Sequence, residues 1–311
     1  MALAPNDFCH LHVHSEYSLL DGGNRIGPML EYVKEIGQDT IALTDHGVLF
    51  GALEFYNAAK KAGVKPIVGC EVYITPTDRT ARGPVEKDNT HHLLLLAENF
   101  QGYQNICKLS SIGHTEGFYY KPRIDFETLE AHKEGVIATS SCLAGLIPQA
   151  LLRDDQKRAN ELTGKFTDIF GADRFFMEIM DHGIRDQSVA NGGIIEIAEK
   201  QNLKLIATND CHYMTKSDAE IHDVLLCVQT GARLADQNRF RFDSSEFYVK
   251  STQEMERVFK DLPHALTNTR HVAEMCNLVM PEKKYRLPKF PCPEGMTETE
   301  LVRLIRGLVR G

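Results

Sequence analysis

The chain has 311 residues, of which 42% are hydrophobic and 25% are charged, and its formal net charge is −8. This length supports one large domain or two smaller ones. The negative charge argues against non-specific attraction of nucleic acid to the whole surface, although a local basic groove or bound metal ions could still attract DNA phosphates.

Apolar runs alternate with amphipathic runs over the first 215 residues, a pattern typical of repeated βα units. Strands are predicted at residues 9–14, 40–44, 66–68 running into 71–74, 92–97, 136–139, 175–179 and 205–208. Helices are predicted at residues 26–36, 49–62, 104–112, 155–169 and 186–201. About seven strands with helices between them fit a closed or nearly closed α/β barrel, without fixing the strand order.

The remaining segments differ in character. Residues 77–89 lack periodicity and predict an exposed loop or β-insertion. Residues 218–280 predict a mostly helical elaboration with one short strand at 246–249, so we assign residues 1–280 to the barrel domain. Residues 281–293 contain four prolines and predict a linker. The apolar spacing in residues 298–310 is typical of the first helix of a further domain.

The eight cysteines are scattered along the chain, without a signal peptide or the dense spacing of small disulfide-rich domains. No apolar run reaches the roughly 18–20 residues of a membrane span. We therefore expect a soluble, cytoplasmic protein with reduced thiols.

Potential metal ligands stand at the ends of the predicted strands. His12 and His14 close the first strand, where side chains two residues apart point the same way at a spacing of about 6.6 Å. Asp210 and His212 follow the last strand. Barrel enzymes place catalysis at the carboxyl ends of their strands, so these donors predict one site of a metallohydrolase. The other donors at strand ends are Asp21, Asp45, His46, Cys70, Glu71, His91, His92 and Cys142.

Several of these residues have an alternative interpretation. Any one histidine alone is more often a surface or packed residue than a ligand. Only one of His91 and His92 can face the barrel interior, and periodicity does not show which. His10 is better interpreted as a packed or hydrogen-bonded residue beneath the site. Asp45 fits equally well as a group that orients a ligand and as a cap of the following helix.

Four segments resemble the motifs of the polymerase and histidinol phosphatase (PHP) superfamily. They are residues 12–15 (HVHS), 43–47 (LTDHG), 69–72 (GCEV) and 208–212 (TNDCH). Residues 14–22 and 96–105 narrow the resemblance to the PHP domains at the amino terminus of bacterial replicative DNA polymerases. The similarity runs through residues 261–269 and so covers nearly the whole chain.

The resemblance implies a distorted seven-stranded (βα) barrel that holds three divalent metal ions, zinc, manganese or iron, through nine ligands. Phosphatase members generally carry histidine where this chain has Asp21 and Cys142, but both are competent ligands, and a thiolate favours zinc or iron over magnesium. On matching positions, the three ions would be held by His12, His14, Glu71 and Asp210, by Glu71, His92 and Cys142, and by Asp21, His46 and His212.

With a complete ligand set, the resemblance implies a 3′–5′ exonuclease that proofreads DNA, with His12, His14, Glu71, Asp210 and His212 as catalytic residues. The implied partners are a single-stranded DNA 3′ end, the remainder of a polymerase chain that synthesises DNA on a template, and replisome subunits including a separate proofreading subunit. Residues 281–311 would lead into the polymerase domain that follows.

Two other functions remain open. The barrel could be a metal-stabilised structural or docking module without activity, or a phosphatase for small molecules such as histidinol phosphate, which residues 218–280 disfavour. Residues 121–123 and 239–242 combine basic and aromatic side chains that could contact single-stranded DNA. Ordinary solvated loops are the commoner interpretation of such segments.

Overall fold

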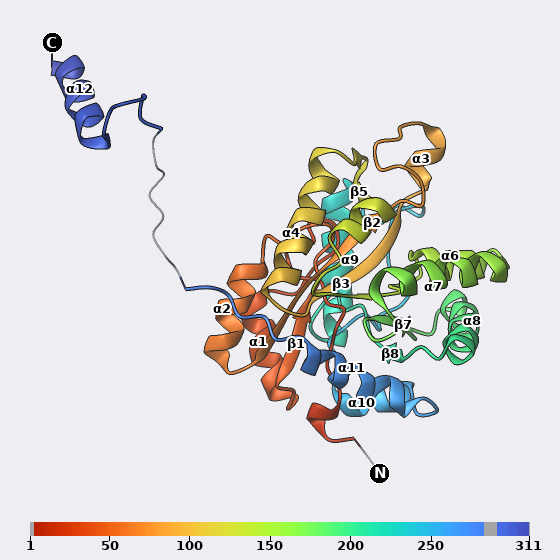
Figure 1. Ribbon diagram of the computed structural model, residues 1–311. Helices are drawn as coiled ribbons and strands as arrows, with labels where there is room; N and C mark the ends of the chain where they lie inside the picture. Colours follow the sequence, from red (N-terminus) through yellow and green to blue (C-terminus); the bar gives the residue numbers. More distant parts are fainter. Residues whose placement is uncertain (1–2, 283–290, 311) are drawn as a thin grey trace. The chain divides into compact units, whose positions relative to one another are not determined.

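The computed structural model describes residues 3–282 and 291–310. The chain divides into two compact units, Met1–Val279 and Met280–Gly311. In the first unit, helices surround a curled sheet, which confirms the predicted α/β class (Figure 1). The second unit contains α12 (Glu298–Arg310). The predicted linker at 281–293 includes residues 283–290, which lie outside the described part of the chain.

The sheet follows the order β4-β5-β2-β3-β6-β7-β8, with β1 paired to β2. All predicted strands from residue 40 to residue 208 are found, each within one residue of its predicted ends, whereas β4 and β5 were not predicted. The strands are β1 (Thr40–Leu43), β2 (Lys65–Ile74), β3 (His91–Ala97), β4 (Phe118–Tyr119), β5 (Lys121–Ile124), β6 (Val136–Thr139), β7 (Phe175–Ile179) and β8 (Leu205–Ala207).

The segment 9–14, predicted as the first strand, is instead extended chain held by isolated bridges. His10 pairs with Ile41 of β1, and Val13 pairs with Cys211, which follows β8. Cys211 exchanges two backbone hydrogen bonds with the segment, at 2.8 and 3.0 Å. The segment thus pairs with both β1 and the chain after β8. Together with β1, β2, β3, β6, β7 and β8 it completes the distorted seven-stranded barrel.

Strand β3 runs antiparallel to both of its neighbours, β2 and β6. The pairs β1–β2, β6–β7 and β7–β8 are parallel. The alternating βα pattern did not predict this reversal. Because of it, the amino-terminal end of β3 lies beside the carboxyl ends of the other strands, and Tyr73 of β2 is paired with His92.

The helices confirm the longer amphipathic predictions, which correspond to α1, α2, α4, α7 and α8; the shorter α3, α5 and α6 were not predicted. Gly63 ends α2 with a φ of +75°, a left-handed conformation that glycine adopts without strain. The helices of the first unit are α1 (Ile26–Glu35), α2 (Ala52–Ala62), α3 (Pro84–Asp88), α4 (Phe100–Thr115), α5 (Phe126–Ala131), α6 (Leu146–Leu152), α7 (Gln156–Phe170), α8 (Arg185–Gln201), α9 (Ala219–Thr230), α10 (Thr252–Val258) and α11 (Pro263–Met275).

The barrel interior is filled at one end by apolar side chains and closed there by α11. Asn268 of α11 donates to the carbonyl of Leu205, and Lys65 donates to the carbonyl of Ala273, so α11 covers the ends where β8 and β2 begin. The opposite end of the barrel is not covered by α11 and is available for a functional site. Segment 9–14 and the strands β1, β2, β3, β6, β7 and β8 each contribute to this inner core. Their residues are Leu11, Ala42, Ile67, Leu96, Ile137, Phe176 and Ile206.

Residues 218–280 are mostly helical, as predicted, but the strand predicted at 246–249 is wrong. Only Tyr248 forms a bridge there, to Tyr213. The predicted loop at 77–89 contains the short α3. In the described segments, every helix is too short or too polar to cross a bilayer.

Candidate metal centre

All nine side chains predicted as ligands lie in one cluster at the open end of the barrel. His46 and Cys142 lie just beyond the carboxyl ends of β1 and β6, and His92 lies at the reversed β3. Each of the nine has a donor atom within 4 Å of another member of the set. Strand ends that are far apart in sequence are therefore brought together, as the barrel prediction requires.

Glu71 occupies the middle of the cluster. Its Oε1 lies 3.2 Å from His12 Nε2 and 3.0 Å from His92 Nδ1. Its Oε2 lies 2.8 Å from His46 Nδ1 and 3.5 Å from His14 Nε2. One buried carboxylate therefore faces four imidazoles, which is the position a bridging ligand would take.

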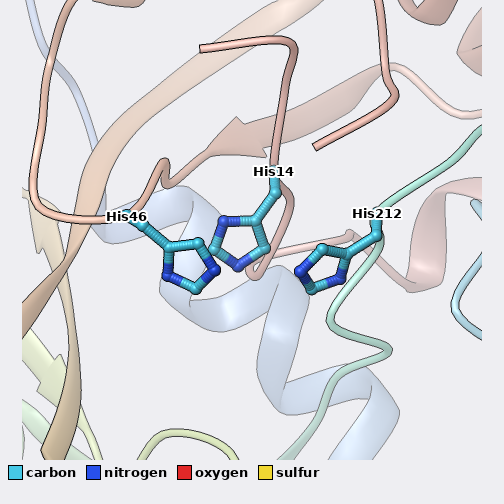
Figure 2. Close-up of side chains that lie close together, drawn as sticks. All are labelled: His14, His46 and His212. Atoms are coloured by element: carbon cyan, nitrogen blue, oxygen red, sulfur yellow. The ribbon is translucent and has the colours of Figure 1, made fainter. Parts of the chain in front are cut away.

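Two aspartates, Asp21 and Asp210, also contact histidines of the cluster. Asp210 Oδ1 lies 3.1 Å from His14 Nε2. Asp21 lies 3.4 Å from His46 Nε2 and 3.9 Å from His212 Nε2. Figure 2 shows the His14 ring between those of His46 and His212, at centroid distances of 4.0 and 4.5 Å.

Cys142 closes the ring of donors beside His92. Its Sγ lies 3.5 Å from Glu71 Oε1 and 3.5 Å from His92 Nδ1. Burial, followed by the nearby carboxylates of Glu71 and Asp210, raises the pKa of the Cys142 thiol well above its usual range. A nearby cation would be needed to hold this group as a thiolate.

Many donor atoms at the centre are close to one another but form no hydrogen bond. Buried polar atoms in proteins are normally satisfied, so atoms without partners that converge on one space need an explanation. Coordination of divalent cations supplies it, and a mixed set of nitrogen, oxygen and sulfur donors suits zinc, manganese or iron. The atoms are His12 Nε2, His14 Nε2, Asp21 Oδ1, His46 Nδ1, Glu71 Oε2 and Asp210 Oδ1.

The pKa values of two histidines depend on which groups surround them in the cluster. Burial, with His46 and His212 close by, lowers the pKa of His14 to about 3. Burial also opposes the charge on His46, but the carboxylates of Asp21 and Glu71 outweigh it and raise the pKa of His46 to about 10. The cluster thus already balances buried negative charge with positive charge, which is the role that bound cations would take.

Glu178 on β7 is a functional candidate that the sequence reasoning missed. Its Oε1 lies 2.9 Å from His12 Nδ1. The hydroxyl groups of Thr139 and Thr208 also donate to this carboxylate. The Glu178 carboxylate accepts from Nδ1 of His12 and so turns Nε2 toward Glu71. The available signal was a lone glutamate within the apolar run FFMEI.

A serine and an aspartate hold the second histidine. His14 Nδ1 lies 3.1 Å from Ser18 Oγ, which donates to Asp45 Oδ1 at 2.8 Å. Asp45 also accepts from the backbone and the hydroxyl of Ser15, at 2.7 and 2.8 Å. Helix α2 starts after Gly51 without a side-chain cap. Of the two interpretations of Asp45, orienting a ligand is therefore the one that its contacts support.

A family model described as "PHP domain" matches residues 10–182. The chain belongs to the PHP family. The DNA polymerase III subunit alpha of Deinococcus radiodurans is 44% identical over 96% of this chain and 23% of the relative. The corresponding subunit of Borreliella burgdorferi is 45% identical over 87% of this chain and 24% of the relative. The chain thus spans about a quarter of the length of these curated relatives.

Two residues of the PHP chain adopt a left-handed backbone beside the cluster. Ser141 has a φ of +61° and Asp210 a φ of +41°. Such conformations cost roughly 1–3 kcal/mol for a residue with a side chain and concentrate at functional sites. Ser141 Oγ donates to Glu71 Oε1 at 2.7 Å. Directly after β6 and β8, the left-handed backbone thus turns the side chains of Ser141 and Asp210 toward the proposed metal ligands.

The structure also separates the histidines that strand periodicity leaves ambiguous. His10 Nε2 lies 2.7 Å from the carbonyl oxygen of Lys250, and its ring packs on Phe8, so His10 is hydrogen-bonded beneath the site as expected. On β3, His92 is the residue that faces Glu71.

At Arg123, neither interpretation of residues 121–123 holds in the structure. Arg123 is fully buried on β5 and donates to the backbone carbonyls of Arg79, Ala81 and Gly117. It is neither a DNA contact nor a solvated loop residue. Its guanidinium satisfies carbonyls of two irregular segments, one before α3 and one after α4.

Proposed function

We propose that the site is a metal-dependent phosphoesterase centre that removes nucleotides from the 3′ end of a DNA strand. The observation that carries this proposal is the convergence of buried donor atoms without hydrogen-bond partners at the open end of the barrel. The similarity to DNA polymerase III alpha subunits supports DNA as the substrate.

We propose three divalent ions, held by the ligand sets that the PHP resemblance implies. Close packing of the donors supports more than one ion, because three overlapping groups each bring their ligand atoms within 4.8 Å of one another. Bound divalent ions would polarise the phosphate and lower the pKa of an attacking water. The three groups are His12, His14 and Glu71; His46, Glu71 and His92; and His14, His46 and His212.

The chain's own residues orient the donors and control access. Glu178 and Ser18 engage the Nδ1 atoms of His12 and His14, so both histidines present Nε2 to the centre. The side chains of His46 and His92 are 13% and 21% exposed, whereas those of His12 and His14 are fully buried. A DNA phosphate would therefore reach the centre from the side of His46 and His92.

The proposed partners follow from the similarity to polymerase subunits. They are a single-stranded DNA 3′ end, the remainder of a polymerase chain, and other replisome subunits including a separate proofreading subunit. Residues 1–280 would form the PHP domain, and residues 281–311 would connect it to the polymerase domain. DNA synthesis itself would belong to the longer protein.

The test is the release of nucleotides from a 3′-labelled single strand by the purified chain with manganese or zinc. The double substitution His12→Ala and Asp210→Ala removes two donors and should reduce the rate by more than the roughly 10–100-fold that loss of an outer partner costs. His10→Gln is the matched control, because His10 lies beneath the site.

Equal rates in the double variant and the wild type would refute the proposal. A metal-loaded but inactive wild type would favour the structural module, and turnover of histidinol phosphate alone would favour the small-molecule phosphatase.

A further inference from the structure

A cavity of about 460 Å³ lies next to the proposed metal centre, between α9 and residues 239–245. Two residues of its lining touch the donor ring directly. The ring of Phe242 lies 4.8 Å from that of His212, and His222 Nε2 lies 2.6 Å from the backbone carbonyl oxygen of Asp21. The cavity therefore adjoins the Asp21 and His212 side of the centre.

The charges around this cavity do not favour a phosphate inside it. Arg239 donates from both terminal nitrogens to the carboxylate of Asp223, at 2.5 and 2.6 Å, so this pair is neutral. The other charged lining residues are Arg241, Glu220 and Asp243, which together carry one net negative charge. An uncharged ligand that offers both donors and acceptors fits this lining better than an anion.

The lining also provides a fixed aromatic surface. Phe242 makes edge-to-face contacts with His222 and Phe247, at centroid distances of 4.7 and 4.6 Å. Ser245 adds a hydroxyl group to the same cavity, whereas Ser244 Oγ donates to the carbonyl of His182. An aromatic wall beside hydrogen-bonding groups is how proteins bind an unstacked nucleobase, and the volume lies in the range of small-molecule sites.

We propose that this cavity binds the nucleobase of the nucleotide at the DNA 3′ end while the adjoining phosphate reaches the metal centre. The inference rests on the proposed function, because it takes its ligand from the same DNA strand. It gives Arg241 and Phe242 of the predicted basic and aromatic segment a specific task, which is to contact the base.

The test measures binding separately from hydrolysis. The 311-residue chain, in the presence of a chelator, is titrated into a 5′-labelled short thymidine strand and into the same strand with an abasic 3′-terminal residue, and binding is followed by fluorescence anisotropy. The wild type should bind the intact strand roughly tenfold more tightly, since stacking of one base on an aromatic side chain is worth about that factor or more.

Two variants locate the effect in the cavity. Phe242→Leu keeps an apolar residue next to His212, and Arg241→Ala removes an exposed side chain. Each should reduce the preference for the intact strand, whereas the exposed Arg233→Ala, which lies outside the cavity lining, should preserve it.

Equal binding of the two strands by the wild type, or a preference unchanged in both variants, would overturn the inference even if the chain hydrolyses DNA. A base preference that depends on Arg241 and Phe242 in a chain that never releases nucleotides would support the inference while the proposed function fails.

Discussion

The inner and outer sides of the metal centre differ in how their histidines are held. On the inner side, His12 and His14 are fully buried, and each has its Nδ1 engaged by a residue outside the donor ring, Glu178 or Ser18. On the outer side, His46 and His92 are partly exposed. In the described segments, the polar partners of their imidazole nitrogens are other proposed metal ligands, such as Glu71.

This contrast predicts two classes of metal affinity. A histidine whose second nitrogen is fixed by a carboxylate has its ligand atom oriented before a metal arrives, so less ordering accompanies binding. A partly exposed histidine without such support can turn. We therefore expect tight binding near His12, His14 and Asp210, and weaker, exchangeable binding near His92 and Cys142, where substrate would enter.

The largest expected effect is that of complete metal removal. The unpartnered donors of both sides lie in the folded barrel, so metal ions bind the native state in preference to the unfolded chain. At concentrations about 100-fold above the dissociation constant, this linkage adds about 2.7 kcal/mol, equivalent to roughly 5–10 °C in Tm for a domain of this size. Differential scanning calorimetry with and without chelator measures the shift. An unchanged Tm would contradict metal binding on either side.

The next-largest effect concerns metal affinity on the inner side alone. Glu178→Gln removes the negative charge that holds the Nδ1 proton of His12 and should lower the affinity of the tight class roughly 10–100-fold. Titration calorimetry on metal-free protein measures it. Glu98→Gln is the matched control, because Glu98 follows the reversed β3 and so lies at the opposite end of the barrel. Loss of affinity in both variants would point to general destabilisation instead.

The sequence predicts the ligands of both sides better than it predicts the residues that support the inner ligands. The ligands themselves are predictable, since His, Asp, Glu and Cys at strand ends stand out against apolar runs and match the PHP motifs. Their support is not, because Glu178 is a single charged residue in an apolar strand, and its contacts with Thr139 and Thr208 join three separate strand regions. Only the folded barrel shows that these residues meet.

The direction of a strand is likewise not predictable from its local sequence. A buried strand has the same apolar run in either direction, so nothing within residues 91–97 shows that β3 is reversed. The left-handed conformations of Ser141 and Asp210 are equally unpredictable, because residues with side chains adopt them only when tertiary contacts require it. Segment 9–14 is predicted as a strand because it is a short apolar run, yet its partners bond to it only at isolated bridges.

The smallest effect tests the outer side. Cys142→Ser exchanges a soft sulfur donor for a hard oxygen next to His92 and Glu71. Since thiolates favour zinc over manganese, the variant should lower zinc affinity of the weak class roughly tenfold and change manganese affinity less. Competition titrations with each metal measure this, and Cys107→Ser, a half-buried cysteine on α4, is the control.

The outcome of this substitution decides whether the two sides are distinct. Cys142 lies 3.5 Å from Glu71, which also faces His12, so the two sides share one carboxylate. If the Cys142→Ser variant weakened the tight class as much as Glu178→Gln does, Glu71 would couple all the ions into one unit. If only the weak class changed, the buried acceptors behind His12 and His14 would be what sets the inner affinity, because they are the contacts that the outer histidines do not have.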